Sequence, residues 1–269
     1  MTFTRSPASA TPPGSEPLHP RLLDIVSIAR ETGRVSVDDL AQQFDVTPQT
    51  IRKDLNDLCE RGHLQRVHGG AVLASGLTNM AYNARRQLAA DAKRLIGKTV
   101  ASLIPNNASI LINIGTTTEQ VAFALRGKRE LMVITNNINV INILAGYTDI
   151  KAVVAPGTYR HADGGVVGEA AVDFIRQFKV DFSVIGASAI DRDGSLLDFD
   201  YQEVKVARAI IENSRHTILV ADRMKLERSA PVRIAHVAQV DTFVTDQPLP
   251  SAIDNICREN DVSVITPQT

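Results

Sequence analysis

The stretch VSVDDLAQQFDVTPQTIRKDLNDL, residues 35–58, decides the fold of the N-terminal part of the chain. It predicts two helices separated by a short break. Ser36 is the expected N-cap of the first helix. Thr47 is the expected cap of the second, followed by Pro48, whose missing N–H costs no hydrogen bond at the first helical position. One face of the second helix is apolar and is expected to be buried, with Ile51, Leu55 and Leu58.

The polar face of the second helix suits DNA. Gln49, Thr50, Arg52 and Lys53 carry the groups that reach base edges and phosphates in a major groove. Downstream, residues 64–67 and 71–73 flank a His-Gly-Gly turn and predict a two-stranded wing. With the helix-turn-helix spanning Val35 to Asp54, the predicted DNA-binding residues are Ser36, Thr47, Gln49, Thr50, Arg52, Lys53, Arg66 and His68.

Net charge does not support this interpretation, and a purely solvated face is the alternative. The whole chain has a formal charge of −1, and residues 20–75 hold seven Arg and Lys against eight Asp and Glu. DNA affinity would therefore depend on local clustering of the basic side chains. An apolar stripe at helical spacing precedes the stretch and predicts a first helix over residues 21–29, so the module is a winged helix-turn-helix over residues 20–75.

The remainder of the chain predicts an α/β domain. A tail at 1–19 and a linker at 76–84 bound the N-terminal module, a charged amphipathic helix is expected over 85–103, and a sensor domain covers 85–269. Short apolar runs then alternate with helical patterns, which indicates βαβ units and a mainly parallel sheet. The predicted strands are Ile110–Ile114, Leu131–Thr135, Ile150–Ala155, Phe182–Gly186, Thr217–Ala221, Thr242–Thr245 and Val262–Ile265.

The sequence IGTTTE, residues 114–119, joins the first of these strands to a helix. Glycine permits a tight turn, and backbone N–H groups, threonine hydroxyls and the helix N-terminus together favour an anion. The loop therefore predicts a phosphate site. The alternative is that the threonines only cap the helix.

Other polar residues follow other strands, where open α/β sheets bind their ligands. Amides, small hydroxyls and one ammonium suit a polyol phosphate, and carboxylates accept hydrogen bonds from its hydroxyls. Asp198, Asp200 and Glu203 are open to a second interpretation, a charge cluster at a helix start. The predicted effector-binding residues are Gly115, Thr116, Thr117, Asn136, Asn137, Gly165, Ser188, Asp198, Glu203 and Lys225.

Composition sets the class of protein. The chain has 269 residues, 44% of them hydrophobic and 22% charged, which is typical of a soluble two-domain protein. Its two cysteines are far apart and predict neither a disulfide framework nor a thiolate metal site. We expect a cytoplasmic protein with no membrane segment, no cofactor, no metal and no catalytic residues.

The residues 35–58, followed by RGHLQRVHGGA at 61–71, resemble the DeoR family of bacterial regulators, and the resemblance covers nearly the whole chain. IGTTTE, TNNINV, DGGVVGEA and the segment 194–216 are similar to its sensor domains, with Thr118 where a proline is usual and Pro156 where a glycine is usual. The resemblance implies a sensor of ribose-5-phosphate-isomerase-like fold and a homodimer or homotetramer. It also implies a repressor released from operator DNA by a small phosphorylated effector such as glycerol 3-phosphate.

Two other functions stay open at this stage. An isomerase-like domain with Asp, Glu and Lys beside a phosphate loop suits an enzyme, although the DNA-binding module argues against one. An activator, or a regulator that senses another sugar phosphate, fits the same residues. The size of the pocket behind Asn136, Glu203 and Lys225 would decide between a three-carbon and a six-carbon ligand.

Overall fold

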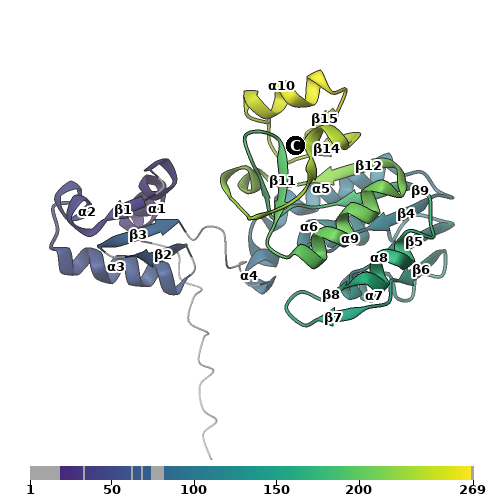
Figure 1. The fold of residues 1–269 in the computed structure, drawn as a ribbon, viewed down its shortest axis with the longest axis horizontal. Helices are drawn as coiled ribbons and strands as arrows, with labels where there is room; N and C mark the ends of the chain where they lie inside the picture. Colours follow the sequence, from purple (N-terminus) through teal and green to yellow (C-terminus); the bar gives the residue numbers. More distant parts are fainter. Residues whose placement is uncertain (1–18, 33, 62, 68, 74–81, 268–269) are drawn as a thin grey trace, which may run out of the picture. The chain divides into compact units, whose positions relative to one another are not determined.

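The computed structural model describes residues 19–32, 34–61, 63–67, 69–73 and 82–267. The chain divides into two compact units, with the boundary between Ser75 and Gly76. Figure 1 shows both units, and each is described by itself below. Residues 1–18 of the predicted tail, residues 76–81 of the predicted linker, and His68 lie outside the described residues.

The first unit combines three helices with a small antiparallel sheet whose strands lie in the order β1-β3-β2. The helices are α1 (Pro20–Thr32), α2 (Val37–Gln43) and α3 (Pro48–Glu60), and the strands are β1 (Arg34–Ser36), β2 (Leu64–Val67) and β3 (Gly70–Leu73). Each of these six elements contributes residues to one apolar core. Its fully buried large side chains are Ile25, Leu40, Ile51, Leu55 and Leu58.

The caps predicted for α2 and α3 are confirmed. The Ser36 hydroxyl accepts a hydrogen bond from the Asp39 amide at 3.0 Å, and the Thr47 hydroxyl accepts one from the Thr50 amide at 3.2 Å. Pro48 takes the first helical position of α3. Each cap satisfies one of the amides that a helix start leaves without an internal partner.

The wing differs from the prediction because it has three strands. The sequence assigned Val35 and Ser36 to a helix start, but Arg34–Ser36 pairs antiparallel with β3 as β1. Val35 is β-branched and buried, which favours a strand here. A Cβ at Gly70 would lie 2.0 Å from the Val35 carbonyl oxygen, so only glycine lets these two strands approach this closely.

The second unit is built on a seven-stranded parallel sheet in the order β15-β14-β12-β9-β4-β5-β6. All seven predicted strands are present, with ends shifted by one to three residues, and every neighbouring pair runs parallel. The predicted α/β class is therefore confirmed. The strands are β4 (Ser109–Ile112), β5 (Leu131–Thr135), β6 (Ile150–Val154), β9 (Val180–Ile185), β12 (Ser214–Val220), β14 (Thr242–Val244) and β15 (Ser263–Ile265).

Helices cover both faces of this sheet because alternate strand residues point to opposite sides. Ile110 and Ile112 belong to the core under α5 (Ala90–Leu103), α6 (Thr116–Leu125) and α7 (Ile138–Leu144). Leu111 belongs to the core under α8 (Glu169–Ile175), α9 (Tyr201–Glu212) and α10 (Ser251–Glu259). No helix in the described part of the chain is long and apolar enough to cross a membrane.

The helix predicted over residues 85–103 is broken in the structure. A short helix α4 (Tyr82–Gln87) ends before Ala89, which has φ 52°, and α5 follows from Ala90. The break is stabilised by the buried Lys93 ammonium, which donates to the carbonyl oxygens of Arg85 at 2.5 Å and Leu88 at 2.7 Å. These are carbonyls that the end of α4 leaves unpaired.

Short elements that the sequence did not predict decorate the carboxyl edge of the sheet. They lack the length that makes hydrophobic periodicity readable. They are the hairpin β7 (Thr158–Arg160) and β8 (Gly165–Val167), the antiparallel sheet β10 (Ala189–Ile190), β11 (Ser195–Asp198) and β13 (Val232–His236), and the 3-10 helices η1 (Arg223–Glu227) and η2 (Val237–Gln239).

Candidate functional site

The outer face of α3 is the candidate DNA-binding surface of the first unit. Gln49, Arg52 and Lys53 are exposed, opposite the buried apolar face of the same helix. The Thr50 hydroxyl shares a hydrogen bond of 2.9 Å with the Thr47 hydroxyl, so both belong to the cap of α3. This arrangement leaves three long side chains for base edges and phosphates, and two hydroxyls at the helix start.

Two of the other predicted DNA-binding residues, Ser36 and Arg66, make hydrogen bonds within the unit. Ser36 caps α2, and the guanidinium of the exposed Arg66 on β2 donates to the Gly70 carbonyl at 3.3 Å across the wing. Arg21 on α1, which was not predicted, donates to both carboxylate oxygens of Asp54 at 2.6 and 3.2 Å. This bidentate pair fixes α3 against α1 and so sets how α3 is presented.

The loop at the carboxyl end of β4 is the candidate phosphate site of the second unit. Gly115 is the N-cap of α6, and no side chain caps the first amides of this helix. The Thr118 hydroxyl donates to the carbonyl oxygens of Asn113 and Gly115 at 2.8 Å each, so it fixes the loop. Thr116 and Thr117 are buried beside it in the first turn of α6. The capping alternative is therefore not what the threonines do.

Buried amides follow the neighbouring strand β5. The Asn136 amide donates to the Val166 carbonyl oxygen on β8 at 3.1 Å, while its own oxygen is buried with no protein partner. The side-chain oxygen of Asn113, at the end of β4, is buried without a partner as well. Asn137 instead caps α7 by accepting from the Asn139 amide at 2.9 Å. Buried acceptors without partners are rare, and a ligand donor would complete them.

Gly165 brings the β7–β8 hairpin against these strand ends. Its backbone forms a bridge with Asn137, and its amide donates to Asp163 at 3.2 Å. A Cβ here would lie 2.5 Å from the end of the Ile114 side chain, so a larger residue would require this side chain to shift.

Four cationic side chains gather near the same edge of the sheet, and we call them the cation cluster: Arg85, Lys93, Lys225 and Arg228. Lys225 follows β12 on η1, and burial lowers its pKa to about 7, helped by the charge of Arg228 and opposed by that of Asp222. Burial also lowers the pKa of Lys93, against the attraction of Asp222. The Arg85 Nε is buried without a partner. Asp222 and Asp163 lie close to this cluster, and burial disfavours the charge on both lysines, which a bound anion would favour again.

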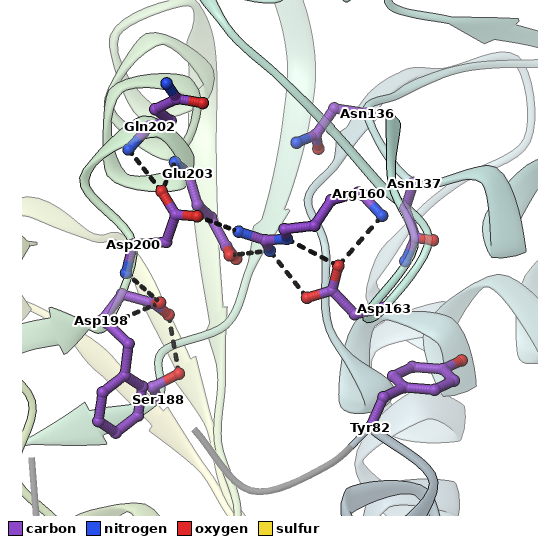
Figure 2. Close-up of polar contacts among 12 residues, drawn as sticks. Tyr82, Asn136, Asn137, Arg160, Asp163, Ser188, Asp198, Asp200, Gln202 and Glu203 are labelled. Atoms are coloured by element: carbon purple, nitrogen blue, oxygen red, sulfur yellow. Dashed lines mark hydrogen bonds and ion pairs between the residues drawn. The ribbon is translucent and has the colours of Figure 1, made fainter. Parts of the chain in front are cut away.

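A second group, the arginine–carboxylate cluster, comprises Arg160, Asp163, Asp200 and Glu203. Figure 2 shows the Arg160 guanidinium between the acidic start of α9 and Asp163. Arg160 donates to both oxygens of Asp163 at 2.9 and 2.8 Å, to Asp200 at 2.7 Å, and to Glu203. Asp200 also caps α9 by accepting from the Gln202 and Glu203 amides, as its alternative interpretation expected.

The predicted carboxylates differ in their state. Burial, together with the nearby charge of Asp198, raises the pKa of Glu203 to about 8 even though Arg160 opposes this, so Glu203 is mostly protonated at neutral pH. Asp198 accepts from the Ser188 hydroxyl at 2.8 Å and from the Phe199 amide at 2.6 Å. Glu203 can therefore donate a hydrogen bond, whereas Asp198 accepts.

Comparison with known proteins gives matches over both units. The DeoR-like helix-turn-helix domain matches residues 21–76, and the DeoR C terminal sensor domain matches residues 88–247. The glycerol-3-phosphate regulon repressor of Escherichia coli (strain K12) is 43% identical over 89% of this chain and 95% of its own length. That of Haemophilus influenzae is 45% identical over 90% of this chain and 94% of its own length. The chain belongs to the DeoR family.

Membership in the DeoR family confirms two of the predictions. The chain combines a helix-turn-helix domain with a DeoR sensor domain, so it is a DNA-binding transcription regulator. The two relatives named above are repressors, which favours the regulator over the enzyme. Among solved structures, ribose 5-phosphate isomerase A from Neisseria gonorrhoeae is similar at 17% identity over 50% of this chain and 52% of that chain, with a TM-score of 0.35.

Several residues of this DeoR sensor domain were missed in the sequence. Lys93 lies among the buried apolar residues of α5 at helical spacing, and a lysine in such a stripe was a readable signal. Arg160 and Asp163 lie on an unpredicted hairpin and gave no such signal. Within the described residues no group of three or more His, Cys, Asp or Glu is arranged to hold a metal ion.

Proposed function

We propose that the protein is a repressor of a carbon-metabolism operon, and that a small phosphorylated polyol or sugar, with glycerol 3-phosphate the first candidate, releases it from its operator. In this proposal residues 20–75 bind DNA, residues 76–84 link the two domains, and residues 85–269 bind the effector. The protein acts in the cytoplasm as a homodimer or homotetramer. The names of the relatives at 43% and 45% identity support this choice of effector.

The observation that carries the proposal is the cluster of partly buried basic side chains beside the loop at Gly115. The carboxyl ends of parallel strands share one edge of a sheet, so the β4 loop and Lys225 after β12 lie at the same edge. Gly186 after β9 packs near both Thr118 and the Val220 carbonyl, within 4 Å for a Cβ placed there. Amides at a helix start and partly buried ammonium groups are suited to a phosphate dianion.

The polyol part of the effector is assigned to the residues that lie further along the edge. The unpartnered oxygen of Asn136 accepts from a hydroxyl, and Glu203 in its protonated form donates to one. Arg160 already binds the carboxylates of this region, which leaves little capacity for a long chain of hydroxyls. A three-carbon phosphate therefore fits this arrangement better than a six-carbon one.

DNA binding is assigned to α3 and the wing. Arg52 and Lys53 are exposed on one side of α3, where they contact phosphates, and Gln49 and Thr50 lie at its N-terminal end, where base edges are read. Two such units in an oligomer would meet two half-sites of an operator.

The test is titration of the full-length protein on DNA from its own promoter, with glycerol 3-phosphate and a hexose 6-phosphate added in turn. We expect glycerol 3-phosphate to weaken the complex and the hexose phosphate to act less. Arg52→Ala combined with Lys53→Ala should weaken DNA binding and lower the salt slope by about one to two units while glycerol 3-phosphate still binds. If no phosphorylated compound weakens the DNA complex, the proposal is contradicted. If glycerol 3-phosphate strengthens the complex, the effector promotes DNA binding and does not release the protein.

A further inference from the structure

Helix α4 is the first described element after the wing, and two of its side chains, Tyr82 and Arg85, contact residues of the second unit. The Tyr82 hydroxyl donates to Glu119 Oε2 at 2.7 Å and accepts from the Asn139 amide nitrogen at 3.0 Å. Burial and the neighbouring Glu119 raise the pKa of the Tyr82 phenol, which keeps it a donor. Tyr82 therefore ties the start of α4 to helices α6 and α7.

Glu119 connects this tie to the phosphate loop. It lies in the first turn of α6, and its amide donates to the Gly115 carbonyl at 3.0 Å. Its carboxylate is buried and accepts from Tyr82, from Asn139 at 3.0 Å and from Asn137 at 3.2 Å. A change in the loop therefore acts directly on the Glu119 carboxylate, which accepts the hydrogen bond from Tyr82.

The other end of α4 depends on the cation cluster. The Arg85 guanidinium lies 3.7 Å from the Asp163 carboxylate, and its Nε is buried without a partner. Lys93 donates to the carbonyl oxygens of Arg85 and Leu88, which close α4. Both cations that secure this end of α4 are thus groups that a bound anion would attract.

A phosphate at the start of α6 would act on both ends of α4. It brings a second negative charge to the turn that holds Glu119, and the repulsion between like charges pushes the Glu119 carboxylate away from its position at Tyr82. It also draws Lys93 away from the α4 carbonyls. Each effect loosens α4, which leads by sequence to the DNA-binding unit.

We infer that Tyr82 is a positioning residue that couples the effector site to DNA binding: with the site empty it holds α4 on Glu119 in the arrangement that binds the operator, and an anionic effector weakens this hold. The inference rests on the proposed function and adds the route by which occupancy of the site is transmitted. Thermodynamic linkage predicts how the two affinities change. A residue that favours the operator-bound arrangement must disfavour effector binding by the same factor.

The experiment measures two affinities of the full-length protein, for promoter DNA and for glycerol 3-phosphate, in wild type and in Tyr82→Phe. We expect Tyr82→Phe to bind DNA about fivefold more weakly or worse, to bind glycerol 3-phosphate more tightly, and to lose at least fivefold of the effector's influence on DNA binding, within the usual range of such coupling. Tyr147→Phe removes the hydroxyl of a more exposed tyrosine and serves as the matched control, with both affinities within twofold of wild type.

Opposite changes in the two affinities separate coupling from damage, since a misfolded sensor would weaken both. If Tyr82→Phe weakens both DNA binding and effector binding, or changes neither, the inference is overturned. The proposed function still stands in that case, provided that the wild type responds to the effector. A wild type whose DNA complex no phosphorylated compound affects overturns both. Glu119→Gln is a second variant: its single amide oxygen can replace only one of two accepting carboxylate oxygens, so either Tyr82 or the Asn137 and Asn139 amides lose their acceptor, and the response to glycerol 3-phosphate falls at least fivefold. An unchanged response in Glu119→Gln also overturns the inference.

Discussion

The cation cluster and the arginine–carboxylate cluster lie at the same edge of one sheet and are built in opposite ways. In the arginine–carboxylate cluster, Arg160 is bound by three carboxylates, and most hydrogen-bonding capacity is used within the protein. In the cation cluster, burial lowers the pKa of Lys225 and Lys93, and the Arg85 Nε has no partner. Apart from the proton on Glu203, the first cluster is complete without a ligand, whereas the Arg85 Nε of the second has no partner.

This difference separates residues that stabilise the fold from residues that are suited to bind a ligand. A charge with a full set of partners stabilises the protein, and its loss leaves those partners exposed to each other. A buried charge without enough partners costs stability and is kept for what it binds. Substitutions in the two clusters should therefore affect different measurements.

The largest effect is expected from Arg160→Ala. It leaves the buried Asp163 and the carboxylates of Asp200 and Glu203 without their shared cation, so we expect the free energy of unfolding of the sensor domain to fall by about 3–5 kcal/mol. Urea unfolding measures this. Arg176→Ala, on an exposed arginine, is the control and should change stability by about 0.5 kcal/mol or less. Equal stability of the two variants would show that the cluster is not self-contained.

Lys225→Met should reverse this pattern. Burial disfavours the charged form of this ammonium, so its removal should leave the melting temperature unchanged or higher. Affinity for glycerol 3-phosphate should fall about a hundredfold. Isothermal titration and thermal unfolding measure the two properties. Lys98→Met, an exposed lysine on α5, should leave both unchanged. Loss of stability without loss of affinity would make Lys225 a structural residue and erase the contrast between the clusters.

The pH dependence of binding tests the same cluster without a mutation. The pKa of Lys225 is lowered to about 7 in the free protein, and a bound dianion raises it, so binding above pH 7 takes up a proton. Affinity for glycerol 3-phosphate should therefore fall by up to about tenfold per pH unit above pH 7. Arg85, Lys93, Arg228 and Asp222 are the charged groups that face this ammonium, and Glu203, with its pKa raised to about 8, loses its proton over the same interval. Lys225→Met should reduce the slope, and a flat slope in wild type contradicts this assignment.

The scaffold of both units could be predicted because its signals are periodic and local. The caps Ser36 and Thr47 and the buried face of α3 followed from spacing alone. The seven parallel strands followed from apolar runs, and they placed Gly115 and Lys225 at one edge. Residues that directly follow a strand were therefore within reach of sequence reasoning.

The partners within the site were not predictable, since they depend on tertiary contacts between short elements. Arg160 reaches Asp200 across 40 positions from a three-residue strand, and nothing in its neighbours marks it. The break between α4 and α5 depends on a lysine folding back onto carbonyls, which overrides the helical pattern of residues 85–103. For the same reason Asn137, predicted to bind the effector, proved to be a helix cap.

The smallest effect separates neighbouring threonines of the phosphate loop. The Thr118 hydroxyl donates to the Asn113 and Gly115 carbonyls, so Thr118→Val should cost about 1–2 kcal/mol of stability by removing the donor to the buried Asn113 carbonyl. Thr116→Val and Thr117→Val should leave stability nearly unchanged and each weaken glycerol 3-phosphate binding by about two- to tenfold, the size of one neutral hydrogen bond. Three isosteric substitutions within one turn thus repeat, on a smaller scale, the division between the two clusters. If all three lower stability alike and none lowers affinity, the loop only shapes the start of α6, and the anion must be held by the cation cluster alone.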